Sequence, residues 1–304
     1  GTTIWADRLD SEDRNLLDLQ DVLSERIVKH LTIQISPEEN ALLKRRRSHN
    51  PEALALYRQA LVLLMPPNDM ERIITARNIF QRVIEIDPGF GGGYAGKAFS
   101  HSITVLFFKT TAPEIELEKG INLALKAIET DPEFGMGYVT LAFAYAMSGR
   151  QDEALSNARR AISVQPGDAF TRFVYGLCLT LFGNPREAMI HLSEAIRLDP
   201  VEPRTPYRNV LGIAYYLSGD YSAATALLEK NLRMGGPTGP HMDIFRASAY
   251  AELGQEENAK SIIGDLIRSY PKFPVSNWLA LWLKSSDDYS RTIENLHRLG
   301  LPKG

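Results

Sequence analysis

Histidine and cysteine are the residue types here that could ligate a metal or act as a base or nucleophile. The six histidines are spread along the chain: His30, His49, His101, His191, His241 and His297. No two of them have the spacing of a zinc pair on one helical turn. The single cysteine, Cys178, excludes both a Cys-x-x-Cys motif and an intrachain disulfide. We therefore expect no metal site and no cofactor.

Motifs for phosphate binding and acyl transfer are also missing. The run Gly91–Gly93 has no Gly-Lys-Ser/Thr ending and follows no predicted strand, so it is not typical of a phosphate-binding loop. No Gly-x-Ser-x-Gly elbow occurs. We expect His191, between Ile190 and Leu192, to lie at the surface or between helices. The sequence indicates a non-catalytic chain, and any enzymatic activity would lie in an upstream domain.

The charge pattern argues against nucleic-acid binding by this chain. Its formal net charge is −3, and the basic run Lys44–Arg47 stands alone. A nucleic-acid interface would combine such a run with aromatic residues on a basic domain, so we interpret it as a solvated helix face. No apolar run approaches the ~20 residues that span a membrane, and Gly1–Trp5 lacks a signal-peptide pattern. These features favour a cytoplasmic protein, and the missing initiator methionine suggests an excised fragment.

One motif occurs twice between Glu133 and Pro200, at a spacing of 34 residues. The first copy consists of Tyr138, Leu141, Ala142, Tyr145, Gly149, Ala154, Ala158, Ala161 and Pro166. The second copy consists of Arg172, Tyr175, Gly176, Leu179, Gly183, Ala188, Leu192, Ala195 and Pro200. Small residues such as Ala142 and Gly176 allow close helix packing, Gly149 allows a tight turn, and Pro166 ends the second helix.

This motif resembles the tetratricopeptide repeat (TPR), whose unit is a helix–turn–helix of 34 residues. The resemblance implies an all-α, right-handed superhelical solenoid of about six repeats over residues 50–271. The second repeat is longer than its neighbours around Phe107–Glu114, so either a helix is extended or a loop protrudes. Residues 272–304 contain two further predicted helices, which would cap the apolar end of the array.

The N-terminus carries a second resemblance, over residues 1 to about 40. Thr2–Trp5 is typical of a short strand, and Asp13–Ile33 has the apolar stripe of a helix. With Trp5-Ala6-Asp7 and Leu19-Gln20-Asp21, this segment resembles the end of a FlgO/TolB-like domain. Such domains precede TPR arrays in bacterial class III nucleotide cyclases and winged-helix transcriptional regulators.

That resemblance implies that residues 1–35 are the remnant of a truncated domain and residues 36–49 a linker helix. The ending Leu296–Gly304 resembles the C-terminus of the same cyclase-type arrays. A lone strand and helix leave a sheet edge unpaired. Residues 1–35 should therefore pack on the array, be mobile, or pair between copies as a homodimer.

The first helix of each repeat lines the concave side of a TPR array, and here its groove positions are unusually apolar. They are Met136, Val139, Phe143 and Met147 in the third repeat, Phe170, Phe173, Leu177 and Leu181 in the fourth, Asn209, Ile213 and Tyr216 in the fifth, and Ile244 in the sixth. Clamps for chaperone carboxylates use Lys, Arg and Asn at this face, so that TPR function fits poorly.

Several occupants could satisfy this surface. Tight curvature or the ends of the chain could cover it, an apolar peptide, helix or small ligand could bind in it, or another copy could pack on it. The N-terminal helix folded into the groove would be autoinhibitory. The sequence thus leaves two hypotheses for function. The chain is either a protein-interaction and regulatory module of a bacterial signalling protein, or a stand-alone adaptor that binds a peptide or ligand in the apolar groove.

Overall fold

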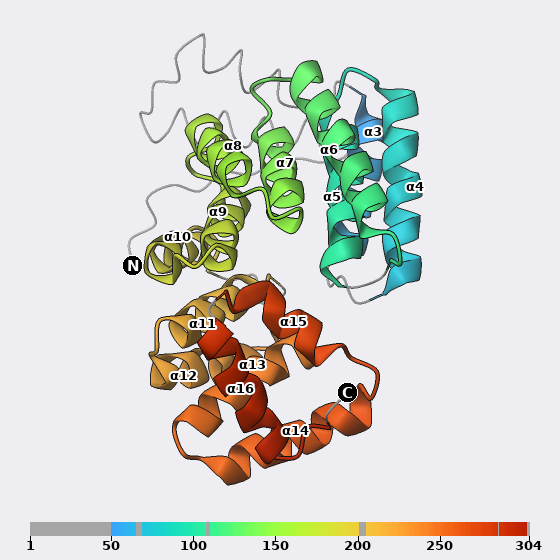
Figure 1. Cartoon of the computed structure of the whole chain (residues 1–304). Helices are drawn as coiled ribbons and strands as arrows, with labels where there is room; N and C mark the ends of the chain where they lie inside the picture. The colour runs from blue at the N-terminus through green and yellow to red at the C-terminus, as the bar shows by residue number, and fades with distance from the viewer. Residues whose placement is uncertain (1–49, 65–68, 108–109, 201–204, 285, 303–304) are drawn as a thin grey trace, which may run out of the picture.

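Figure 1 shows the computed structural model, which describes residues 50–64, 69–107, 110–200, 205–284 and 286–302. These residues form fourteen α-helices and no strand. The helices are α3 (Pro51–Leu63), α4 (Met70–Ile86), α5 (Gly91–Leu106), α6 (Pro113–Thr130), α7 (Gly135–Met147), α8 (Gln151–Val164), α9 (Ala169–Leu181), α10 (Pro185–Leu198), α11 (Tyr207–Leu217), α12 (Tyr221–Arg233), α13 (Pro240–Glu252), α14 (Glu256–Ser269), α15 (Val275–Trp282) and α16 (Ser286–Arg298). The predicted all-α fold is confirmed, whereas the predicted N-terminal strand, helix and linker lie outside the described residues.

Helices α3 to α14 form six consecutive helix–turn–helix pairs, as the repeat spacing predicts. In Figure 1 the pairs follow one another along a curved path, with α3 and α4 at its N-terminal end. The Asn50 side chain begins α3 by accepting hydrogen bonds from the backbone nitrogens of Glu52 (2.9 Å) and Ala53 (3.2 Å). Prolines two residues beyond α8 and α10 mark the ends of those helices.

The motif residues have the packing roles that their spacing predicts. Gly149 and Gly183 adopt φ values of 71° and 79°, in the left-handed region that the interhelix turn requires. At Gly176 a Cβ atom would lie 2.6 Å from Leu192 Cγ, so only glycine lets α9 approach α10 this closely. Ala154 and Ala188 are fully buried at the same kind of contact.

The second pair is longer because both of its helices are extended. Helices α5 and α6 contain 16 and 18 residues, compared with 13 and 14 in α7 and α8. The extension carries Phe107, the residue after α5, beyond the ends of the neighbouring first helices and into contact with the C-terminal part of the chain.

The last two helices turn back over the inside of the array. Helix α15 packs against α9 and α13, and α16 packs against α13 and α15. Because α9 and α13 are first helices of their pairs, α15 lies on the concave side, and in Figure 1 it is found between α13 and the end of α5. We refer to α15 and α16 together as the C-terminal cover.

The main core extends from α3 into the cover, and two smaller apolar clusters pack between α3 and α4 and among α5, α6 and α7. Cys178 in α9 is fully buried in the main core, with its Sγ 4.0 Å from the carbonyl oxygen of Ala142 in α7. Burial raises the pKa of this thiol to about 12, so the cysteine packs as a small apolar residue.

Candidate functional site: the covered concave surface

Aromatic side chains from consecutive first helices meet along the inner face of the array. They form an inner aromatic row of Phe99, Phe143, Phe170, Phe173 and Tyr207. The ring centroids of Phe99 and Phe143 are 5.4 Å apart, and those of Phe173 and Tyr207 are 5.1 Å apart. These are favourable separations for aromatic pairs, so the row joins α5, α7, α9 and α11 into one apolar wall.

Two tryptophans of α15 occupy the space that this wall encloses. Trp278 is 2 % exposed, and its ring packs against those of Phe107 and His241, at centroid distances of 6.5 and 5.5 Å. Its Nε1 donates a hydrogen bond to the carbonyl oxygen of His241, at 3.1 Å. The ring centroid of Trp282 lies 6.1 Å from that of Phe245 in α13, edge to face.

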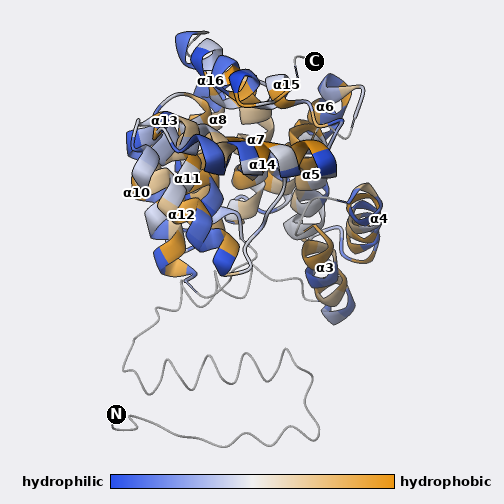
Figure 2. Cartoon of the chain, turned by 90° about the horizontal axis from the view of Figure 1, so that it is seen from below, coloured by the Kyte–Doolittle hydropathy of each residue, from blue (hydrophilic) through white to orange (hydrophobic). Residues whose placement is uncertain are grey.

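Polar contacts hold α16 in place over α11, α13 and α14. The hydroxyls of Tyr216 and Thr292 are 2.8 Å apart in a buried hydrogen bond. Arg291 Nε lies 3.2 Å from Glu252 Oε1, and Arg298 pairs with Glu256 of α14. Figure 2 shows hydrophilic and hydrophobic stretches alternating on α16, as expected for a helix with one face against the array and the other face in solvent.

The twelve predicted groove residues lie on α7, α9, α11 and α13, but the surface they form is largely covered. Nine are buried: Val139, Phe143, Phe173, Leu177, Leu181, Asn209, Ile213, Tyr216 and Ile244. Three are half-buried: Met136, Met147 and Phe170. Among the described residues, α15 packs against α9 and α13 and α16 packs against α13, so the C-terminal cover lies over part of this surface. The predicted N-terminal helix lies outside the described residues.

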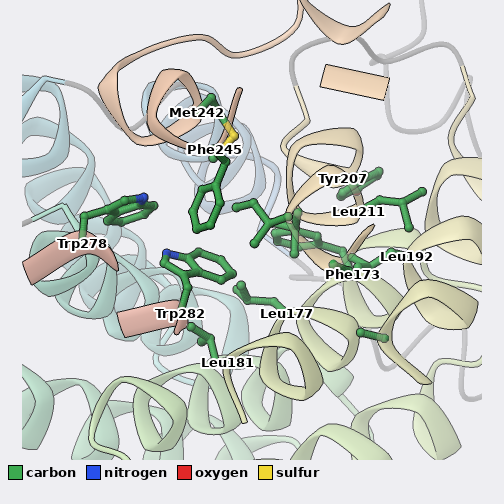
Figure 3. Close-up of a cluster of buried hydrophobic side chains, with 14 of the residues drawn as sticks. Phe173, Leu177, Leu181, Leu192, Tyr207, Leu211, Met242, Phe245, Trp278 and Trp282 are labelled. Atoms are coloured by element: carbon green, nitrogen blue, oxygen red, sulfur yellow. The ribbon is translucent and has the colours of Figure 1, made fainter. Parts of the chain in front are cut away.

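A cavity of about 90 Å³ remains between the wall and the cover. It brings together four of the predicted residues, Phe143, Phe173, Leu177 and Asn209. Figure 3 shows Phe173 and Leu177 on one side and Trp278 and Trp282 on the other. Burial lowers the pKa of His241, at its edge, to about 4, so this imidazole is neutral at pH 7. The lining is thus uncharged and mostly apolar.

Sequence reasoning did not place Phe107, His241, Trp278 or Trp282 at this site. Around Phe107 the sequence permits either an extended helix or a protruding loop. The two tryptophans lie in helices that the sequence predicts to cap the end of the array. One signal was present. Two of the three tryptophans in the chain stand at the i, i+4 spacing that puts them on one helix face.

A second polar cluster ties together α4, α5 and α6. Glu116 Oε2 lies 2.8 Å from His101 Nδ1 and 3.2 Å from an Arg77 nitrogen, and Arg77 also donates to the Ser100 hydroxyl at 3.1 Å. Burial, followed by the charge of Arg77, lowers the pKa of His101 to about 4. This network pairs the Arg77, His101 and Glu116 side chains with one another and braces the three helices.

The remaining residues that the sequence singled out are separate from the cavity. His191 packs its ring 4.4 Å from that of Tyr175, between α9 and α10.

In the described part of the chain, no group of three or more His, Cys, Asp or Glu side chains could hold a metal ion. None of the helices described here is long and apolar enough to cross a membrane.

Comparison with known proteins agrees with the repeated helix–turn–helix pairs of this structure. The family model described as tetratricopeptide repeat matches residues 246–272, in α13 and α14. A crystal structure of TTC0263, a TPR protein from Thermus thermophilus, superposes with a TM-score of 0.51 and 21% identity, covering 65% of this chain and 98% of that one. The chain has the fold of a tetratricopeptide-repeat solenoid. A structure of IFIT1 with Gppp-AAAA gives a TM-score of 0.60 at 16% identity, over 94% of this chain and 65% of IFIT1.

Two curated proteins resemble this chain in sequence. A protein of Rhizobium meliloti (strain 1021) assigned as adenylate cyclase 3 is 33% identical over 101 residues, which are 31% of this chain and 16% of that protein. The TPR repeat-containing protein YpiA of Bacillus subtilis (strain 168) is 24% identical over 274 residues, 87% of this chain and 60% of YpiA. The chain therefore spans less than two thirds of either relative.

Proposed function

We propose that this chain is a regulatory interaction module whose concave surface binds an apolar helix from a protein or peptide partner. The observation that carries the proposal is the position of α15. Its two tryptophans pack against the first helices of the array, so the surface suits an apolar helix with aromatic anchors. Aromatic residues that fill enclosed pockets are the usual anchors of such interfaces. A partner helix would replace the C-terminal cover.

We further propose that the module belongs to a bacterial signalling protein with an upstream effector domain, a nucleotide cyclase or a transcriptional regulator. The stretch shared at 33% identity with a protein assigned as an adenylate cyclase supports this. So does the resemblance of residues 1 to about 40 to a FlgO/TolB-like domain. In this arrangement catalysis lies in the effector, and the array works in the cytoplasm, where a cyclase finds ATP.

A stand-alone adaptor is the second candidate, and the similarity to YpiA over 87% of the chain favours it. The coding sequence upstream of the codon for Gly1 separates the two. A cyclase or winged-helix domain there supports the signalling protein. A start codon without either domain supports the adaptor. The proposed homodimer through residues 1–35 is tested by size-exclusion chromatography of the chain with and without that segment.

The binding surface is tested with a fluorescent peptide of residues 272–302, which contains the cover. The intact chain should bind it weakly because its own cover competes. Arg291→Gln breaks the pair with Glu252 and loosens α16. Each 1.4 kcal/mol by which the closed state is weakened should tighten apparent binding about tenfold.

Two controls accompany this titration. Arg268→Gln removes an exposed pair with Asp265 on α14 and should leave binding unchanged. A peptide with Trp278→Ala should bind far more weakly than the unmodified peptide. Equal binding of both peptides, or no binding by Arg291→Gln although hydrogen exchange shows α15 open, would refute the proposed surface.

A further inference from the structure

The cavity between the wall and the cover has the lining of a site for a small apolar molecule. Its side chains come from α5, α7, α9, α11, α13 and α15 and are predominantly aromatic or aliphatic. The cavity of about 90 Å³ is smaller than the engineered 150 Å³ cavity known to bind benzene. Half-exposed residues, among them Leu106, Phe107 and Pro206, also line it, so it reaches the surface.

One polar atom in this lining is unsatisfied. Trp282 is 3 % exposed, and its indole Nε1 is buried with no hydrogen-bond partner. In Figure 3 this nitrogen is on the edge of the ring that faces Trp278, the other tryptophan of the lining. An indole N–H can only donate, and leaving such a donor unpaired in the interior is costly.

The other polar side chains of the lining are already engaged or neutral. Trp278 Nε1 donates to the His241 carbonyl oxygen. Asn209 Nδ2 donates to the Pro237 carbonyl oxygen at 2.9 Å, and its Oδ1 accepts from Asn231 at 2.7 Å. Because its pKa is lowered, His241 is uncharged at pH 7 and places no cation at the edge of the cavity. A buried water needs two to four polar partners, which this lining does not offer around Trp282.

We propose that this cavity binds a small neutral molecule with an apolar body and one hydrogen-bond acceptor, which pairs with Trp282 Nε1. The apolar body replaces contacts that the void lacks. The acceptor, a carbonyl or ester oxygen, satisfies the indole donor. Ionic ligands are excluded because no opposite charge lines the site and burying an unpaired ion is strongly unfavourable. This inference requires neither a protein partner nor an effector domain.

The test uses two probes of the same shape, cyclopentanone and methylenecyclopentane, which differ in a C=O against a C=CH₂ group. The chain contains three tryptophans, so ¹⁵N-tryptophan labelling gives three indole N–H resonances. Cyclopentanone should move the Trp282 resonance downfield in a saturable titration, because the N–H gains an acceptor. Methylenecyclopentane should bind without this downfield shift. No saturable shift of the Trp282 resonance with the ketone would overturn the proposal.

Two matched variants measure the hydrogen bond itself. Trp282→Phe keeps an aromatic ring but removes the donor. The ratio of ketone to alkene affinity should then fall about fivefold, the scale of one net hydrogen bond. Tyr250→Phe in α13, outside the lining, removes a hydroxyl that already donates to Glu229 and should leave the ratio unchanged. An unchanged ratio in folded Trp282→Phe would also overturn the proposal, and if that variant does not fold, the wild-type titration decides alone.

Discussion

Gly176 is a residue whose missing side chain sets the distance between two helices. A Cβ atom there would lie 2.6 Å from Leu192 Cγ and 3.2 Å from the Ala188 carbonyl oxygen. We expect Gly176→Ala to lower the free energy of unfolding by about 1–2 kcal/mol, because overpacking outweighs the better helix propensity of alanine. Urea denaturation measures the change. In Gly167→Ala, where a Cβ would have open space, the stability should stay the same or rise slightly.

His241 gives the stability of the molecule a pH dependence. Burial lowers its pKa to about 4 in the folded chain, against about 6.5 when unfolded. Between these values the unfolded state binds the proton and the folded state does not, so stability falls as the pH drops from 6.5 toward 4. One such group contributes at most about 1.4 kcal/mol per pH unit.

We therefore expect His241→Phe, which keeps a ring against Phe107 and Trp278, to flatten the pH dependence of the urea midpoint between pH 6.5 and 5. The pKa of His101 is also lowered to about 4, so part of the slope should persist. A slope identical to that of the wild type would show that His241 takes up its proton in the folded state as readily as in the unfolded state.

At the scale of elements, one buried hydrogen bond and two ion pairs connect α16 to the array. Tyr216→Phe removes the buried hydrogen bond and leaves the Thr292 hydroxyl without that partner. We expect a loss of about 1–2 kcal/mol and faster amide hydrogen exchange in α15 and α16, with α7 and α8 unchanged. Tyr215→Phe, at the adjacent position of α11, is the control. Exchange that accelerates equally in α7 and α8 would mean that the cover does not open separately.

The sequence predicts the individual helices well. It does not predict where the last two helices, α15 and α16, pack on the array. The positive φ of Gly149 and the close contact at Gly176 follow from local rules of turns and packing. The contact of Phe107 with Trp278 joins residues far apart in the chain, and no local pattern encodes it. The apolar inner face was evident at Phe143 and Phe173. What covers it depends on where α15 packs, which only tertiary structure decides.

At the scale of the whole molecule, the cover changes how the array should unfold. Open repeat arrays are stabilised by contacts between neighbours and can unfold in parts. Here α15 and α16 add contacts with α9, α11 and α13 of the last three pairs, and Trp278 of α15 also packs against Phe107 of the second pair. We expect the intact chain to unfold in one transition followed by circular dichroism, and the chain without residues 272–304 to show a broader transition with a lower m value. Identical m values would argue against this coupling.

The burial of Cys178 has a practical consequence for following these motions. The chain has a single thiol, it is sealed between α9 and α7, and its high pKa keeps it in the unreactive protonated form. A thiol reagent can thus modify the molecule only when the centre of the array opens. The rate of this labelling, followed by mass spectrometry as the addition of one label per chain, measures how often the array opens. It needs no engineered reporter, and it separates movement of the C-terminal cover from opening of the repeats beneath it.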